Sequence, residues 1–521
     1  MASSHYSAYR VNYALRSHKR DAFIEFIKAQ LLSPFALHAR PLLLEGGENE
    51  NSDLTGLRDH YASIFASVEH LVLDHMAEQH KKKPQSRLQM LVPTLGKFLT
   101  PLPLRDAFLE YDERSAMSQR RHVAPSFNEI RNILNSAQII ALAPDLELIT
   151  FDGDMTLYDD GANFEEDSTL VQLLVRLISF TNLHVAIVTA AGYEEAERYE
   201  YRLSGLLRGF ATHKLPASAA TKFWVMGGEA NYLFRTNEQY RLQRVHLPFL
   251  PEDYFAHMLA KPASEGKRDD LALAAALANP GASSAAADAS DKVGSSATSA
   301  VNGGGQVLGL ETVAVGAAAA STEFYGGTDA DVGLAPPLER ASSSMLDLLP
   351  PAHNPAATAA AVTALLDVAE RVLRATARSM RLPARVIRKS RAVGIIAASP
   401  DVKLQREQLD ECVLGLQHAL AAHTRERSGA LPPVPWCAFN GGADCWVDVG
   451  NKLIGVKLLC EVLRIESKKV VHVGDQFLST GNDFAARRGC PTLWIASPQE
   501  TANAVGELIR LMETAGRSLC V

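Results

Sequence analysis

The chain has 521 residues, of which 47% are hydrophobic and 21% are charged, and its formal net charge is -7. This composition is typical of a globular protein large enough for two or three domains. The mild acidic excess gives no support to nucleic acid or an anionic membrane as the main partner. None of the six cysteines forms a C-x-x-C pair, the N-terminus is polar, and no stretch has the ~20 apolar residues of a membrane span. A cytoplasmic protein is expected.

Residues 1–145 are predicted to be mainly helical. Apolar residues recur at helical spacing over residues 21–32 and 56–80. Ser126 and Glu129 form a capping-box pattern that predicts the start of a further helix.

An alternation of strands and helices follows this helical region. Short apolar strands are predicted at residues 146–151, 184–188, 470–473 and 492–495. Strands separated by helices indicate a parallel sheet with right-handed crossovers. Such a sheet carries its functional loops at the carboxyl ends of the strands.

A long interruption, from residue 192 to 451, separates the second and third of these strands. It is predicted to be a second α+β domain inserted into the sheet domain. Its strand candidates are residues 223–226, 392–396, 435–439 and 445–449. Within the insertion, residues 279–345 are dominated by Ala, Ser and Gly, which predicts a disordered loop.

Two carboxylates follow the first strand of the predicted sheet. Asp152 and Asp154 flank Gly153, and Thr156 comes two residues later. Carboxylates at this spacing can share a divalent ion and still divide roles. One attacks phosphorus, while the other donates a proton to the leaving oxygen and later activates water. The alternative is an ordinary Asp-Gly turn.

Polar side chains also follow the second and third strands. Thr189 ends the second strand, Asp475 ends the third, and Asp483 follows eight residues later. Oxygen ligands of this kind suit Mg²⁺ that also binds a phosphate. Lys452, at the start of the preceding helix, could stabilise both Asp152 and a transferring phosphoryl group. Taken singly, the alternatives are a helix cap, a Gly-Asp turn and a surface lysine.

Four features resemble, in this order along the chain, the motifs of the haloacid dehalogenase superfamily of phosphotransferases. They are Asp152-x-Asp154-x-Thr156, Thr189, Lys452, and Asp475 followed by Asp483. The second aspartate, Asp154, is typical of its phosphatases. Too few residues separate Asp152 from Thr189 to hold a large cap domain. The insertion after Thr189 corresponds to the C2 cap position of that superfamily, where an α+β lid excludes water.

Longer strings resemble the IMP-specific 5'-nucleotidase family of this superfamily. They are residues 126–131, 151–161, 187–193, 225–234 and 439–448. The resemblance implies an α/β fold: a Rossmann-like parallel-sheet core with an inserted α+β C2-type cap and a helical N-terminal domain.

The expected domain boundaries follow from this fold. They are a helical regulatory or oligomerisation domain over 1–145, a catalytic core over 146–191 and 452–521, and a cap over 192–451.

The resemblance implies Mg²⁺-dependent hydrolysis of IMP to inosine and phosphate, in purine salvage or degradation. Asp152 would be the nucleophile and Asp154 the proton donor and general base. Both would ligate the metal, Asp154 through its backbone oxygen, and Asp475 would complete the metal shell. The implied substrate-binding residues are Asp152, Asp154, Asp160, Thr189, Asp444 and Lys452.

Further contacts are less constrained by the sequence. The candidates for contacts to the base are Tyr193, Trp224, Asn231, Tyr232, Asn440 and Trp446, although ordinary packing is the favoured interpretation of each. The resemblance also suggests ATP as an allosteric effector and a homotetramer. Arg120, Arg121 and Arg131 could contact a triphosphate, but solvated helix charges are the favoured interpretation.

Two other functions stay open. One is a C2-capped phosphatase or phosphomutase that acts on another nucleotide or a sugar phosphate. The other is a non-catalytic regulatory protein of the same fold, which the intact set of five polar residues disfavours.

Overall fold

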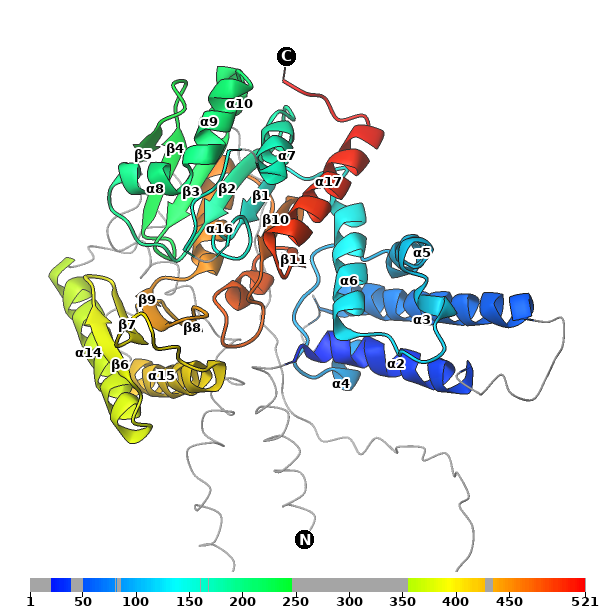
Figure 1. The fold of residues 1–521 in the computed structure, drawn as a ribbon, viewed down its shortest axis with the longest axis horizontal. Helices are drawn as coiled ribbons and strands as arrows, with labels where there is room; N and C mark the ends of the chain where they lie inside the picture. Colours follow the sequence, from blue (N-terminus) through cyan, green and yellow to red (C-terminus); the bar gives the residue numbers. More distant parts are fainter. Residues whose placement is uncertain are drawn as a thin grey trace, which may run out of the picture.

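A computed structural model of the chain shows three regions: a helical bundle, a large sheet flanked by helices, and a smaller sheet with two helices (Figure 1). The structure describes residues 20–38, 50–79, 81, 86–159, 161–166, 168–245, 355–426 and 434–520. The predicted loop at 279–345 lies outside the described residues. None of the described helices is both long and apolar enough to cross a membrane.

The helical bundle packs around a single apolar core. Tyr61, Phe65 and Phe108 are buried at its centre, with the rings of Phe65 and Phe108 stacked at 4.9 Å. The predicted capping box is confirmed, since Ser126 and Glu129 bond each other's backbone N–H groups at the start of α6. The elements are α2 (Ala22–His38), α3 (Glu50–Glu78), α4 (Arg87–Leu91), α5 (Leu104–Ser115), η2 (Met117–Gln119) and α6 (Phe127–Leu142).

The bundle is fastened to the sheet domain through the buried side chain of Arg131. Its guanidinium donates two hydrogen bonds to Glu500, at 2.8 and 2.9 Å, and a third to the carbonyl of Trp494. The interpretation of Arg131 as a solvated helix charge is therefore wrong. Arg120 lies nearer the surface and pairs with Glu129 at 2.8 Å.

The large sheet has seven strands in the order β11-β10-β1-β2-β3-β4-β5. The first five are parallel, and β4 and β5 are antiparallel additions at one edge. The strands are β1 (Leu148–Phe151), β2 (His184–Val188), β3 (Phe223–Gly227), β4 (Tyr232–Thr236), β5 (Leu242–Arg244), β10 (Val470–Gly474) and β11 (Thr492–Trp494).

Alternating side chains of these strands pack against helices on both faces of the sheet. Ile149 and Phe151 face the core formed with α7, α9 and α17, while Leu148 faces the core formed with α16. The helices and helical turns of this region are α7 (Thr169–Ile178), α8 (Ala196–Arg202), α9 (Ser204–Thr212), α10 (Ala217–Ala220), α16 (Lys452–Leu463), η3 (Ser467–Lys469), η4 (Asp483–Arg488) and α17 (Pro498–Thr514).

The smaller sheet is antiparallel, in the order β6-β7-β9-β8, and its outer face is covered by two helices. Its inner face is turned toward the carboxyl ends of the large sheet (Figure 1). The elements are α14 (Pro355–Ser379), β6 (Ala384–Arg388), β7 (Ala392–Ala397), α15 (Arg406–Glu426), β8 (Trp436–Asn440) and β9 (Cys445–Val449). We call this unit the cap.

The cap is smaller than the sequence predicted. The sequence predicts that the strand at 223–226 belongs to the inserted domain, but β3 pairs in parallel with β2, and β4 and β5 extend the same sheet. That part of the prediction is wrong, because an isolated strand sequence does not specify which sheet it joins. The functional roles assigned to the domains stay predictions.

Candidate active site

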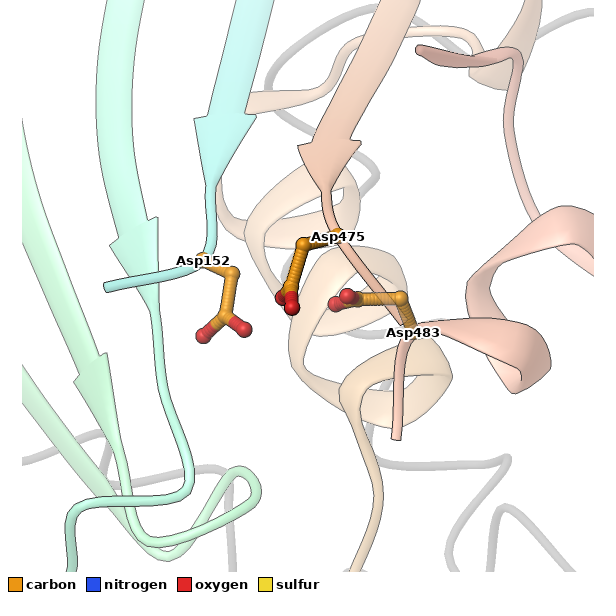
Figure 2. A group of neighbouring side chains, drawn as sticks. All are labelled: Asp152, Asp475 and Asp483. Carbon is orange, nitrogen blue, oxygen red and sulfur yellow. The ribbon is translucent and has the colours of Figure 1, made fainter. Parts of the chain in front are cut away.

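Three aspartates converge at the carboxyl edge of the large sheet (Figure 2). Asp152 follows β1, Asp475 follows β10, and Asp483 stands at the start of η4. β1 and β10 are neighbours, so their ends meet at one point of the crevice. One carboxylate oxygen from each of the three lies within 4.8 Å of the others, close enough to hold one cation.

Lys452 lies in the middle of this negative cluster. Its ammonium is fully buried and pairs with Asp152 Oδ2 at 2.7 Å and with Asp483 Oδ1 at 2.6 Å. Burial acts to lower the pKa of Lys452, but the two carboxylates raise it well above its ordinary value. The side chain is therefore a permanent cation against the predicted nucleophile.

Asp483 is the most heavily bonded of the three carboxylates. Besides Lys452, it accepts the backbone N–H of Gln476 at 2.9 Å, and it lies 2.9 Å from Nε2 of His472. Burial acts to raise its pKa, but Lys452 and His472 hold that pKa well below the usual range. Asp483 is thus a fixed negative charge.

Glycine is required beneath Asp483. A Cβ at Gly474 would lie 2.3 Å from Oδ2 of that carboxylate. The imidazole behind it, His472, has its pKa lowered by burial, and its Nδ1 lies 2.8 Å from the hydroxyl of Thr150. Sequence reasoning noted Asp483 after Asp475 but left it out of the predicted ligands, and it gave no role to His472.

Asp152 and Asp475 differ from Asp483 in their electrostatics. Burial raises the pKa of Asp152 to about 7 and that of Asp475 to about 8, and neighbouring carboxylates add to both shifts. Oδ1 of Asp475 is buried without a hydrogen-bond partner among the described residues. An orphaned oxygen beside two further carboxylates fits a divalent cation with hard-oxygen preference, such as Mg²⁺.

Asp154 lies beside the cluster but is not one of its three members. Its Oδ1 accepts hydrogen bonds from Arg202 at 2.6 Å and from the backbone N–H of Gly161 at 3.1 Å. The guanidinium of Arg202 also lies over the ring of Tyr158, 5.2 Å from its centroid. Arg202 therefore orients the predicted acid and base, a role that the sequence did not indicate.

Glu229 is a second residue that sequence reasoning missed. Its carboxyl is fully buried behind the cluster and accepts one hydrogen bond from the Asn482 amide, at 3.3 Å. Burial raises its pKa to about 8, although Lys452 acts to lower it. The only sequence signal was its place within the string at 225–234.

A cavity of about 740 Å³ lies between the large sheet and the cap. Of the predicted residues, Asp152, Asp154, Thr189, Asp444 and Asp475 line it. The lining candidates for base contacts are Tyr193, Asn231, Tyr232, Asn440 and Trp446.

Two described residues that were candidates for substrate contacts, Lys452 and Trp224, do not line the cavity. Trp224 is buried in β3, where its indole N–H bonds His184, and it does not line the cavity. Trp224 is therefore excluded as a base contact, and it packs as the favoured interpretation expected, although in the large sheet and not in the cap. Asp160 lies outside the described residues.

Comparison with known protein families assigns the chain to one of them. A sequence profile described as IMP-specific 5'-nucleotidase matches residues 5–259 and 353–505. The chain belongs to the IMP-specific 5'-nucleotidase family. The predicted family, the α/β fold class and the enzyme class of phosphoric monoester hydrolases are confirmed.

Relatives in this family match nearly the whole chain. IMP-specific 5'-nucleotidase 1 of Neurospora crassa is 36% identical, with 97% of this chain and 98% of that protein covered. The Saccharomyces cerevisiae relative of the same name is 34% identical, with 98% and 99% covered.

Solved structures from the family share the fold. An IMP-bound mutant of Plasmodium falciparum IMP-nucleotidase superposes with a TM-score of 0.65 at 26% identity, covering 96% of this chain and 99% of that one. An ATP-bound structure of the same nucleotidase superposes with a TM-score of 0.61 at 27% identity, covering 97% and 88%.

Proposed function

We propose that this IMP-specific 5'-nucleotidase family member hydrolyses inosine 5'-monophosphate to inosine and phosphate through a phosphorylated Asp152. The observation that carries the proposal is the position of Asp152. It ends a parallel strand in the crevice, pairs with the buried Lys452 at 2.7 Å, and lies within a cluster of carboxylates. Relatives across the full length are known as IMP-specific 5'-nucleotidases.

Mg²⁺ is the proposed cofactor, held by Asp152, Asp475 and Asp483, together with the backbone oxygen of Asp154. When bound, the ion would neutralise charge on the transferring phosphoryl group. Asp483 joins the predicted ligand set because its carboxylate lies within 4.8 Å of the other two.

In the first step, an oxygen of Asp152 attacks phosphorus and the bond from phosphorus to O5' of the ribose breaks. Asp154 gives its proton to that leaving oxygen, so that inosine departs as a neutral alcohol. The described residues bond only Oδ1 of Asp154. Its Oδ2 is therefore left for the proton.

In the second step, Asp154 takes a proton from water as the water oxygen attacks phosphorus. The bond to Asp152 breaks, and phosphate is released with Asp152 restored as a carboxylate. Lys452 and the hydroxyl of Thr189 hold the phosphate, and Asp160 and Asp444 contact the nucleoside.

The resemblance also supports ATP as an effector, a homotetramer and a cytoplasmic location. One Plasmodium falciparum relative has been solved with ATP bound. Sedimentation of the full chain with and without ATP tests the first two, and microscopy of a fluorescent fusion tests the third.

Phosphate release from IMP, AMP, GMP and sugar phosphates, with Mg²⁺, tests the activity itself. If the wild type prefers IMP and Asp152→Asn releases no phosphate, the result supports both IMP as the substrate and Asp152 as the nucleophile. Equal rates on AMP or on sugar phosphates would be consistent with the proposed phosphatase chemistry but would contradict the assignment of IMP as the substrate. Absence of any Asp152-dependent phosphate release would favour a non-catalytic protein.

A further inference from the structure

One strand of the cap presents alternate residues to the cavity. Along β9, Cys445, Val447 and Val449 pack into the core beneath α14 and α15. The residues between them, Trp446 and Asp448, line the cavity. A carboxylate in the middle of a sheet is unusual, and Asp448 lies on the face of the sheet that lines the cavity.

Asp448 is buried and has small neighbours on both adjacent strands. It lies opposite Cys437 on β8 and Ala392 on β7, and only 7% of its surface is exposed. None of the described residues donates a hydrogen bond to its carboxyl or forms an ion pair with it. Burial raises its pKa to about 7, while Lys389 acts to lower it. A buried carboxyl without a hydrogen-bond partner is stabilised by a ligand that supplies a hydrogen-bond donor.

A cation and an aromatic ring complete the same surface. The ammonium of Lys389 lies 4.3 Å from the centroid of the Trp446 ring and also lines the cavity. The indole lies against the backbone of Gly394, where a Cβ would come within 2.4 Å of it. The ammonium therefore lies over the indole, and the cap offers an acceptor, Asp448, and a donor, Lys389, on the same wall of the cavity.

The geometry points to Asp448 and Lys389 as the residues that read the base, selecting a 6-oxopurine over a 6-aminopurine. The inference rests on the proposed function and names the cap residues that set its specificity. A 6-oxopurine carries an N1–H donor beside an O6 acceptor, which match a carboxylate beside an ammonium. Adenine presents the same two positions with donor and acceptor exchanged.

A ribose diol is the alternative ligand for this pair, because its hydroxyls can donate to a carboxylate and accept from an ammonium. IMP and AMP carry the same ribose, however, so a contact to the sugar would not separate the two nucleotides, whereas a contact to the base edge would.

The test measures kcat/KM for IMP and AMP, together with the inhibition constant of ribose 5-phosphate against IMP. The enzymes compared are wild type, Asp448→Asn, Lys389→Met and a control, Asp401→Asn, whose carboxyl is exposed elsewhere in the cap. We expect Asp448→Asn to lower kcat/KM for IMP by about 10- to 100-fold and to change AMP far less. Lys389→Met should act in the same direction, and the inhibition constant should stay unchanged.

An unchanged ratio of IMP to AMP in both variants would overturn the inference. So would an equal loss of ribose 5-phosphate binding, because that would assign Asp448 to the sugar or to the fold. Lys389 is exposed at a turn, so Lys389→Met provides a readout even if Asp448→Asn folds poorly. If wild type itself shows no preference for IMP, the proposed function fails instead.

Discussion

The two walls of the cavity use charge in opposite ways. On the sheet side, Lys452 is buried between Asp152 and Asp483, with distances below 3 Å to each. On the cap side, Asp448 and Lys389 form no ion pair with each other or with another described residue, and both line the cavity. Paired buried charges are preorganised for a fixed reaction, while unpaired polar groups wait for a ligand. With the proposed function, this difference assigns the chemistry to the sheet wall and the reading of the base to the cap wall.

The largest effect should come from the sheet wall at the nucleophile. Asp152→Asn removes the attacking carboxylate, so phosphate release should fall by at least about 10⁴-fold on every substrate. The measurement is single-turnover phosphate release, with circular dichroism as the control for folding. If Asp152→Asn still turned over one substrate but not the others, the separation of the two walls would be contradicted, because the sheet wall would then contribute to the selection of the substrate.

Lys452→Met tests the paired cation. We expect kcat to fall by about 10²- to 10³-fold, because two buried carboxylates lose their counter-charge and the phosphoryl group loses a donor. Lys457→Met, at an exposed position on the same helix, should leave kcat unchanged. Comparable losses in the two variants would show that the helix, not the buried ion pair, is responsible.

Asp475→Asn tests the orphaned oxygen. The variant should bind Mn²⁺, as a probe for Mg²⁺, about 100-fold more weakly in calorimetry, because one anionic ligand becomes neutral. Asp145→Asn, exposed before β1 at the other end of the sheet, serves as the control. Unchanged affinity in Asp475→Asn would remove this residue from the metal set.

Trp494→Phe sharpens the comparison at a further residue of the sheet wall. The indole N–H of Trp494 donates to the backbone carbonyl of Asp475 at 2.8 Å. Loss of this bond should weaken Mn²⁺ binding by about tenfold without changing the preference for IMP over AMP. Trp224→Phe, whose indole bonds His184, should leave both quantities unaltered.

The smallest effect on activity is expected where the helical bundle joins the sheet domain. Arg131→Gln breaks the buried link to Glu500 and should lower the free energy of unfolding by about 2 kcal/mol in urea titrations. Arg510→Gln breaks an exposed pair with Glu507 and should cost less than about 1 kcal/mol. A change in substrate preference in either variant would contradict the separation of the walls.

The sequence predicted the sheet wall better than the cap wall, for a physical reason. Asp152, Thr189 and Asp475 follow apolar strands, and the ends of parallel strands meet wherever those strands pair. Asp483 arrives from a loop, and no periodicity shows that this loop returns to Lys452.

The cap wall depends on which face of a sheet meets the ligand. The alternation in Cys445-Trp446-Val447-Asp448-Val449 is visible in the sequence, but the docking of the cap decides which set lines the cavity. The same limit explains the misplaced strand at 223–226, since pairing with β2 is a long-range contact.

The connection from the cap to Lys452 bears on turnover. β9 ends at Val449, whose carbonyl accepts a hydrogen bond from Asn231 at 2.7 Å, and Gly450 follows with φ +101°. Lys452 begins α16 two residues later. If the chain rotated at Gly450, Lys452 would hardly move because it lies two residues away, while Trp446, roughly 13 Å from Gly450 along the strand, would move much further. Rotation of the cap about Gly450 would leave the ammonium on both aspartates, so release of the nucleoside would not require the charged network to be rebuilt.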